Sequence, residues 1–222
     1  MGKLLDFGFY NMDCMEGMRQ FPDKFFDLAI VDPPYRDMKE NQPTKDMRRN
    51  GTMERFGNKP DDAYFQELFR VSKNQIIWGA NNFDLPNYKG FVIWKKKTIS
   101  EDFTMSMAEL AYISEGLGTI SKIYECQPQG GAEKRIHPTQ KPVALYEWLL
   151  TKYAKPGDTI LDTHVGSASS LIACHKHRHK FVGFELDPEY YKAAKARLDA
   201  EMAQTTIFDF IGGGETEKDN IS

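Results

Sequence analysis

Two segments of the sequence combine acidic side chains with residues that fix the shape of the backbone. Asp32-Pro33-Pro34-Tyr35 comes directly after the apolar run 28–31. The prolines fix φ and lack an N–H, so the chain must leave a β-sheet at that point. In an open α/β sheet the carboxyl end of a strand is where ligands bind. The pattern therefore predicts a site here, although a stiff turn with an incidental carboxylate is the simpler alternative.

The second segment, residues 159–170, is typical of a buried strand that ends at Asp162, a turn of small residues and the start of a helix. Such a turn lets a ligand approach the backbone, and the helix start offers free N–H groups. Glu185 ends the next predicted strand and follows Gly166 by 19 residues, close to the spacing at which an acid reaches a ribose hydroxyl. An ordinary strand–helix–strand unit with Glu185 as a helix cap explains the same pattern.

The turn after Asp162 differs from a dinucleotide-binding turn. It reads Gly-Ser-Ala-Ser-Ser from Gly166 and lacks the further glycines that let a pyrophosphate lie close to the backbone. A cationic nucleoside without a pyrophosphate fits better between two acids, Asp162 and Glu185. S-adenosylmethionine is a ligand of that kind.

The surrounding elements alternate short apolar strands with amphipathic helices, which predicts an α/β domain with a mostly parallel sheet. Predicted strands cover 7–11, 26–31, 75–78, 90–94, 108–113, 159–162 and 181–184, and predicted helices cover 62–71, 142–153, 169–175 and 188–204. Residues 36–61 are predicted to form a long basic loop and 115–135 an irregular stretch that helps to recognise the target. One domain is expected over 1–208, and an acidic tail, 209–222, is expected to be disordered.

Composition narrows the class of protein. The 222 residues are 41% hydrophobic and 27% charged with a net charge of −3, which excludes wholesale disorder and a generally basic nucleic-acid-coating protein. Three cysteines without a CxxC pair favour a reducing compartment over a disulfide framework or a zinc site. No apolar run is long enough to cross a bilayer. A cytoplasmic protein with no membrane partner and no metal is expected.

Several motifs, in one order along the chain, resemble the β group of DNA amino-methyltransferases, which act on adenine N6 and cytosine N4. The matching pieces are Asn-Met-Asp-Cys-Met-Glu at 11–16, Asp-Pro-Pro-Tyr at 32–35, His-Pro-Thr-Gln-Lys-Pro at 137–142 and Phe-Glu-Leu-Asp-Pro-Glu-Tyr-Tyr at 184–191. The resemblance spans roughly residues 8–200. It implies a circularly permuted Rossmann-like fold that depends on S-adenosylmethionine. The chain departs from the family at His164 and Ala168, where an aromatic residue and a second glycine are usual.

The resemblance implies a catalytic role for Asp32, Pro33, Pro34 and Tyr35. Asp32 and the carbonyl of Pro33 would accept the two hydrogens of the target amine, and Tyr35 would stack on a base flipped out of the duplex. The residues expected around the cofactor are Asp13, Cys14, Asp32, His137, Thr139, Lys141, Asp162, His164, Gly166, Ser167, Ala168, Ser169, Ser170 and Glu185.

Within that cofactor set, the resemblance assigns Glu185 to the ribose hydroxyls. Asp162 and the turn 166–170 would surround the methionine part, and Asp13 with Cys14 would lie near the adenine. Lys141 would meet the methionine carboxylate, which needs a cationic or N–H partner. Without the surrounding motif, a solvated lysine at a helix entry explains Lys141 as well.

DNA is the expected partner, and residues 36–59 contain seven Lys/Arg against four Asp/Glu. The residues expected to contact DNA phosphates are Arg36, Lys39, Lys45, Arg48, Arg49, Arg55, Lys95 and Lys96. A plain solvated strand end explains Lys95 and Lys96 equally well. The chain has no room for a separate target-recognition domain, so a short recognition site or a second subunit is expected. A homodimer, a restriction endonuclease partner, and a bacterial or phage origin are further expectations.

The type of methylated base stays open between two members of the resembled family. Asp32 favours adenine N6, because many cytosine-N4 enzymes of the family carry serine at that position. Cytosine N4 is the first alternative. A methyltransferase for protein or RNA is a second, and a non-catalytic relative that binds DNA or a partner is a third, supported by His164 and Ala168.

Overall fold

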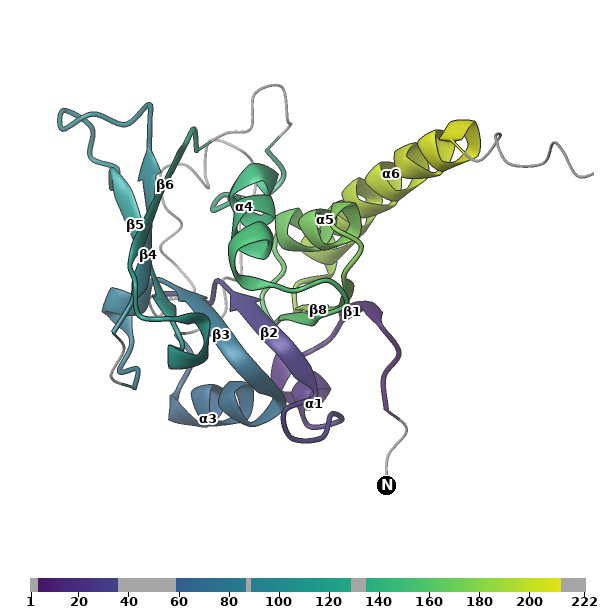
Figure 1. The fold of residues 1–222 in the computed structure, drawn as a ribbon, viewed down its shortest axis with the longest axis horizontal. Coiled ribbons are helices and arrows are strands. Elements are labelled where there is room, and N and C mark those ends of the chain that lie inside the picture. Colours follow the sequence, from purple (N-terminus) through teal and green to yellow (C-terminus); the bar gives the residue numbers. More distant parts are fainter. Residues whose placement is uncertain (1–3, 36–58, 87–88, 129–134, 213–222) are drawn as a thin grey trace, which may run out of the picture.

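The computed structural model describes residues 4–35, 59–86, 89–128 and 135–212. Within these residues, eight strands form one sheet in the order β1-β8-β7-β2-β3-β5-β4-β6 (Figure 1). The strands are β1 (Gly8–Asn11), β2 (Phe26–Val31), β3 (Ser72–Trp78), β4 (Phe91–Lys96), β5 (Ala108–Ile113), β6 (Lys122–Cys126), β7 (Thr159–Asp162) and β8 (Lys180–Glu185). The helices are α1 (Cys14–Met18), α3 (Asp62–Val71), α4 (Val143–Tyr153), α5 (Ser169–Lys176) and α6 (Pro188–Gly212), with short 3-10 turns η1 (Ala80–Asn82) and η2 (Glu115–Leu117).

The sheet is mostly parallel, as the alternation of strands and helices predicts. β5 is the exception, since it runs antiparallel to β3 and to β4. From β7 the chain moves to β8 on one side, whereas from β2 it moves to β3 on the other. The strand order therefore reverses between β7 and β2, which are hydrogen-bonded neighbours. Ligands of open α/β sheets bind at the carboxyl ends of the strands beside such a reversal.

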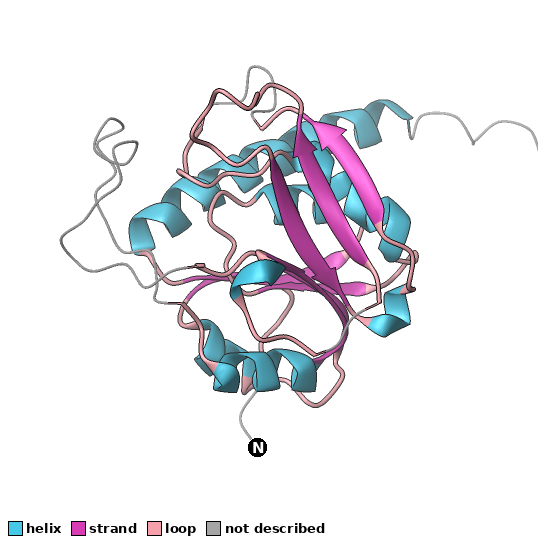
Figure 2. Ribbon diagram, turned by 90° about the vertical axis from the view of Figure 1, so that its left-hand side faces the viewer, coloured by secondary structure: helices cyan, strands magenta, loops and turns pink. Residues whose placement is uncertain are grey.

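Helices cover both faces of the sheet (Figure 2). Side chains alternate between the faces along β2: Leu28 and Ile30 join one buried cluster, and Ala29 and Val31 join the other. The first cluster packs against α4, α5 and α6, and the second against α1 and α3. β2 is thus buried on both faces, and its carboxyl end is held rigidly at the centre of the sheet.

The strands at 26–31, 108–113 and 159–162 and the helix at 62–71 agree residue for residue with the sequence prediction. The other predicted elements exist, with ends shifted by a few residues. α6 reaches Gly212, so residues 209–212 are helical and the prediction of a tail that begins at residue 209 is wrong there. Residues 213–222 lie outside the described part of the chain. No helix among the described residues is long and apolar enough to span a membrane.

The structure corrects the prediction that residues 115–135 are irregular. Lys122–Cys126 forms β6, which pairs in parallel with β4 at the edge of the sheet. The alternation in this segment is weak because Ile123 is exposed rather than buried, and the surrounding glycines and proline favoured a loop. The five-residue helix α1 was also missed, since it is too short to show a helical period.

Candidate active site

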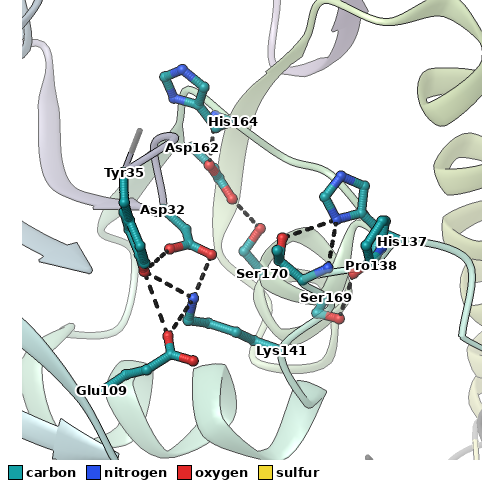
Figure 3. A network of polar contacts seen from close by, with 12 residues as sticks. Asp32, Tyr35, Glu109, His137, Pro138, Lys141, Asp162, His164, Ser169 and Ser170 are labelled. Carbon is teal, nitrogen blue, oxygen red and sulfur yellow. Dashed lines mark hydrogen bonds and ion pairs between the residues drawn. The ribbon is translucent and has the colours of Figure 1, made fainter. Parts of the chain in front are cut away.

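The Asp32 carboxylate lies just past the end of β2, where the prolines carry the chain out of the sheet. Its Oδ1 accepts a hydrogen bond of 2.6 Å from the Tyr35 hydroxyl, and its Oδ2 accepts one from the Lys141 ammonium group (Figure 3). Burial, with the negative charges of Asp32 and Glu109, raises the pKa of Tyr35 far above its usual value. Tyr35 is therefore a permanent donor to the carboxylate.

The Tyr35 ring is seated on the backbone of Gly79, which follows β3. A Cβ added to Gly79 would lie 2.1 Å from Cε1 of Tyr35, and Gly79 has φ of +72°. Only glycine satisfies both the close approach and the left-handed backbone. Phe83 meets the Tyr35 ring edge-on, with ring centroids 6.1 Å apart. The end of β3 thus fixes the aromatic ring of the segment 32–35.

Lys141 joins the segment before α4 to the segment 32–35. Its side chain is 4% exposed, and its ammonium lies 2.9 Å from Oε2 of Glu109 as well as against Asp32. The ammonium also lies 5.4 Å from the centroid of the Trp78 ring. Burial would lower the pKa of Lys141, but the two acids outweigh it and hold it above its usual value. The charge argument that assigned Lys141 to a cofactor carboxylate is weakened, because two carboxylates of the chain already neutralise it.

Glu109 of β5 is a site residue that the sequence analysis missed. Its Oε1 pairs with Lys96 at 2.7 Å and its Oε2 with Lys141 at 2.9 Å. The available signal was a charged residue inside an otherwise apolar strand. The side chain of Lys96 is only 9% exposed and pairs with Glu109, and its predicted contact with a DNA phosphate stays a prediction.

Asp162 ends β7 with a buried carboxylate and neutral partners. Its Oδ1 accepts the backbone N–H of His164 at 3.0 Å, and its Oδ2 accepts the hydroxyl of Ser170. Burial raises the pKa of Asp162 to about 7, against the opposing effect of these two hydrogen bonds. Among the described residues, no lysine or arginine forms an ion pair with Asp162. Its negative charge is therefore left without a cation inside the fold.

The turn after β7 brings its backbone to the surface of the site. Gly166 has φ of +56° and faces the His137 ring, which a Cβ would meet at 3.5 Å. Ala168 has φ of +64° and is buried, so it adopts the backbone shape for which the resembled family uses glycine. Ser167 and Ser169 are 3.1 Å apart at their hydroxyls and are buried within the fold.

α6 braces this turn from behind. Nη1 of Arg197 donates to the carbonyl of Ser167 at 2.7 Å and to the hydroxyl of Ser169 at 3.0 Å. These two serines, which were expected around the cofactor, are therefore held by the fold itself. They shape the turn from its buried side.

Glu185 ends β8 and is held by backbone N–H groups. Its Oε2 accepts from Gly166 at 2.9 Å, and its Oε1 accepts from Asp187 at 2.9 Å. Burial raises the pKa of Glu185, although these hydrogen bonds oppose the shift. The side chain of Asn11 donates to the carbonyl of Glu185 at 2.8 Å and ties the end of β1 to the end of β8. Glu185 therefore stands beside the Gly166 turn, as the spacing predicted.

The segment before α4 closes another side of the turn. His137 lies against Gly166 and contacts the Tyr190 ring with centroids 4.4 Å apart. Its Nδ1 lies 3.1 Å from the hydroxyl of Thr139. Burial lowers the pKa of His137 to about 4, so the ring is neutral at pH 7. His137 and Thr139 are thus near the turn, as the resemblance implies.

His164 packs away from the turn toward α3. Its Nδ1 lies 2.9 Å from the hydroxyl of Thr163, and its ring meets that of Tyr64 edge-on at 5.4 Å. Burial lowers its pKa to about 4. Asp13 caps α1 by accepting the N–H of Met15 at 2.8 Å, and this cap places Cys14 at the carboxyl end of β1.

The structure therefore brings the predicted cofactor and catalytic segments together at the carboxyl ends of the central strands, at the reversal between β7 and β2. Lys95 is exposed and pairs with Glu125 at 2.9 Å, and its predicted contact with DNA stays a prediction. Six expected DNA contacts lie outside the described residues: Arg36, Lys39, Lys45, Arg48, Arg49 and Arg55. These features define a Rossmann-like fold in which a partly buried carboxylate, Asp32, lies near a turn of small residues at the strand-order reversal.

Comparison with known proteins identifies the family. A family profile described as DNA methylase, of the N6/N4 methyltransferase type, matches residues 35–196. The chain therefore belongs to the N6/N4 DNA methylase family. It is 27% identical to the Escherichia coli (strain K12) protein YubD over 216 residues, which cover 86% of this chain and 90% of YubD.

Two solved structures share the fold. The PvuII DNA methyltransferase, which is cytosine-N4-specific, superposes with a TM-score of 0.62 at 13% identity and covers 93% of each chain. The complex of M1.HpyAVI with S-adenosylmethionine superposes with a TM-score of 0.56 at 22% identity, covering 86% of this chain and 98% of that one. These similarities confirm the predicted methyltransferase fold, and its circularly permuted order stays a prediction.

Proposed function

We propose that this protein transfers a methyl group from S-adenosylmethionine to the N6 amine of adenine in DNA. The observation that carries the proposal is the position of Asp32 and Tyr35 beside the Asp162 turn, at the reversal of a methyltransferase sheet. Membership of the N6/N4 DNA methylase family supports DNA as the substrate. Aspartate at the first position of the catalytic motif favours adenine over cytosine.

The residues of the turn fit this cofactor. Gly166 presents its backbone with a left-handed φ, and the unpaired acid Asp162 offers negative charge to a cationic ligand. Glu185 can still accept a ribose hydroxyl, since its two carboxylate oxygens offer about four acceptor sites and three backbone N–H groups, those of Gly166, Leu186 and Asp187, act on them. When bound, the cofactor supplies an electrophilic methyl group on a positively charged sulfur.

The chain's own residues activate the amine. The lone pair of an exocyclic adenine nitrogen is delocalised into the ring, so the amine is a poor nucleophile. Asp32 and the carbonyl of Pro33 accept its two hydrogens and favour a pyramidal nitrogen with a localised lone pair. Tyr35 stacks on the flipped base and, with Gly79 behind it, holds the ring in place. The nitrogen gains a methyl group and loses one proton, for which Asp32 is the nearest base.

One assay tests the chemistry and the base together. The protein is incubated with DNA and radiolabelled S-adenosylmethionine, and the DNA is digested to nucleosides. The expected labelled product is the deoxynucleoside N6-methyldeoxyadenosine. Labelled N4-methylcytosine without N6-methyladenine would overturn the choice of base, and transfer to RNA or protein but not to DNA would overturn the substrate class.

The biological partners stay proposals beside this activity. A homodimer, or a restriction endonuclease of the same system, would supply additional contacts with DNA. Sedimentation of the protein with and without DNA tests the homodimer. Modification-sensitive sequencing of DNA from expressing cells tests for a defined target site.

A further inference from the structure

Glu109 stands at the centre of a buried group of four charges that includes the catalytic Asp32. Its carboxylate is bracketed by two ammonium groups, Lys96 at 2.7 Å and Lys141 at 2.9 Å. Its side chain is only 20% exposed. Burial would raise the pKa of Glu109, but the two lysines outweigh it and hold it at about 2. Glu109 is therefore a permanent anion in this group.

Lys141 forms ion pairs with two carboxylates, and its interaction with Glu109 determines how strongly it pairs with Asp32. Its ammonium contacts Oδ2 of Asp32 on one side and Oε2 of Glu109 on the other (Figure 3). The hydroxyl of Tyr35 lies 3.4 Å from the same ammonium and 3.5 Å from Oε2 of Glu109. The ring of Trp78 covers another side of the ammonium. The surrounding side chains therefore leave the Lys141 ammonium few other positions.

The four charges balance: Asp32 and Glu109 are negative, and Lys96 and Lys141 are positive. Removal of the Glu109 charge leaves one excess positive charge and a single buried carboxylate, Asp32. Buried charges interact strongly, so Lys141 would then pair with Asp32 alone. A carboxylate that is fully paired with an ammonium is a weaker acceptor for the neutral N–H of a substrate amine.

We propose that Glu109 is a positioning residue that draws Lys141 partly off Asp32 and so keeps Asp32 a strong acceptor for the target amine. The inference rests on the methyl transfer proposed above. It assigns to β5, the antiparallel strand of the sheet, a part in the chemistry that takes place at the end of β2. Glu109 acts through Lys141 and does not touch the substrate.

The first test is Glu109→Gln, which keeps the shape and removes the charge. We expect kcat to fall about tenfold or more, which corresponds to at least one lost charge-assisted contact in the transition state. The KM for DNA and the calorimetric Kd for S-adenosylhomocysteine should stay within about threefold, because the cofactor turn is untouched. An unchanged kcat, or a parallel loss of cofactor affinity and melting temperature, would overturn the proposal.

The matched control is Glu67→Gln on α3. Glu67 is also a partly buried glutamate in an ion pair, 15% exposed and 2.7 Å from Arg70, and it lies away from the site. Arg70 keeps Asp23 as a second partner, so no cation is left alone. The control should retain its kcat, which separates the effect of Glu109 from that of any lost buried ion pair.

A double variant decides whether Glu109 acts on Lys141 or merely neutralises Lys96. Lys96→Met with Glu109→Gln restores the charge balance but leaves Lys141 with Asp32 alone. We expect the double variant to be as slow as Glu109→Gln. Recovery of the wild-type kcat would overturn the proposal, since neutralisation of Lys96 would then be the whole role. A wild-type protein that transfers no methyl group would instead refute the proposed function itself.

Discussion

The site contains two pairs of acids that the fold treats in opposite ways. Asp32 and Glu109, on the β2–β5 side, are paired with buried lysines, and the pKa of Glu109 is about 2. Asp162 and Glu185, on the β7–β8 side, accept only N–H and hydroxyl groups, and burial raises the pKa of both, that of Asp162 to about 7. We call the β2–β5 side the closed side, because lysines already neutralise its two acids. We call the β7–β8 side the open side, because its acids form no ion pair with a lysine or arginine among the described residues.

This difference follows from what the chain places beside each strand end. The lysines reach the β2 side from β4 and from the segment before α4. The β7 side is instead covered by the small residues 166–170, which supply N–H and hydroxyl groups but no cation. The closed side suits a neutral amine, because the amine needs a hydrogen-bond acceptor that points in a fixed direction. The open side suits a sulfonium ligand, since the free-energy cost of removing an unpaired carboxylate from water is offset only when a cation binds beside it.

The largest expected effect is on the closed side. Asp32→Ala should reduce methyl transfer by about 10³-fold or more, because the amine loses its acceptor and base. Lys141 keeps Glu109 as a partner, so no ammonium is left unpaired and the fold should survive. Cofactor affinity measured by calorimetry should change less than about threefold, since the acids of the open side are intact.

Asp23→Ala is the control for Asp32→Ala, because Asp23 is 76% exposed and lies outside the site. It should leave both transfer and cofactor binding at the wild-type level. A loss of cofactor binding in Asp32→Ala that matches its loss of transfer would contradict the division of the site into two electrically different sides.

A smaller effect is expected on the open side, as a function of pH. With a pKa of about 7, Asp162 is mostly protonated at pH 6 and mostly ionised at pH 8. A sulfonium ligand prefers the ionised form, so the affinity for S-adenosylmethionine should rise up to about tenfold from pH 6 to pH 8. The neutral thioether S-adenosylhomocysteine should show a much weaker rise. Calorimetry with both ligands at each pH measures the difference.

The control for the pH effect is Asp162→Asn, which should bind S-adenosylmethionine more weakly and with no rise over this pH range. An equal pH dependence for the two ligands would mean that Asp162 does not sense the sulfonium charge. The difference in ion pairing between the two pairs of acids would then have no effect on cofactor affinity.

The two sides also differ in how far the sequence could predict them. The open side was predictable, because Asp162, Gly166 and Glu185 carry their spacing within one strand–helix–strand unit. The position of Asp32 at the end of a strand was also predictable, since the prolines that follow it mark the strand end. The ion pairs that surround Asp32 were not predictable, because Glu109 and Lys96 are brought to this group by the antiparallel pairing of β5, which no local pattern encodes.

The smallest expected effect concerns the backbone of the open side. Ala168→Gly would relieve a left-handed φ worth about 1–2 kcal/mol, but it would lose a buried methyl group worth about 0.8 kcal/mol and gain unfolded-state entropy worth about 0.4–1 kcal/mol. The free energy of unfolding should therefore change by less than about 1 kcal/mol. Ala173→Gly, a buried alanine in regular α5, has no strain to relieve and should lose about 2 kcal/mol. Urea unfolding compares the two variants. An equal loss in both would show that Ala168 carries no backbone strain, and that the turn tolerates alanine as readily as glycine.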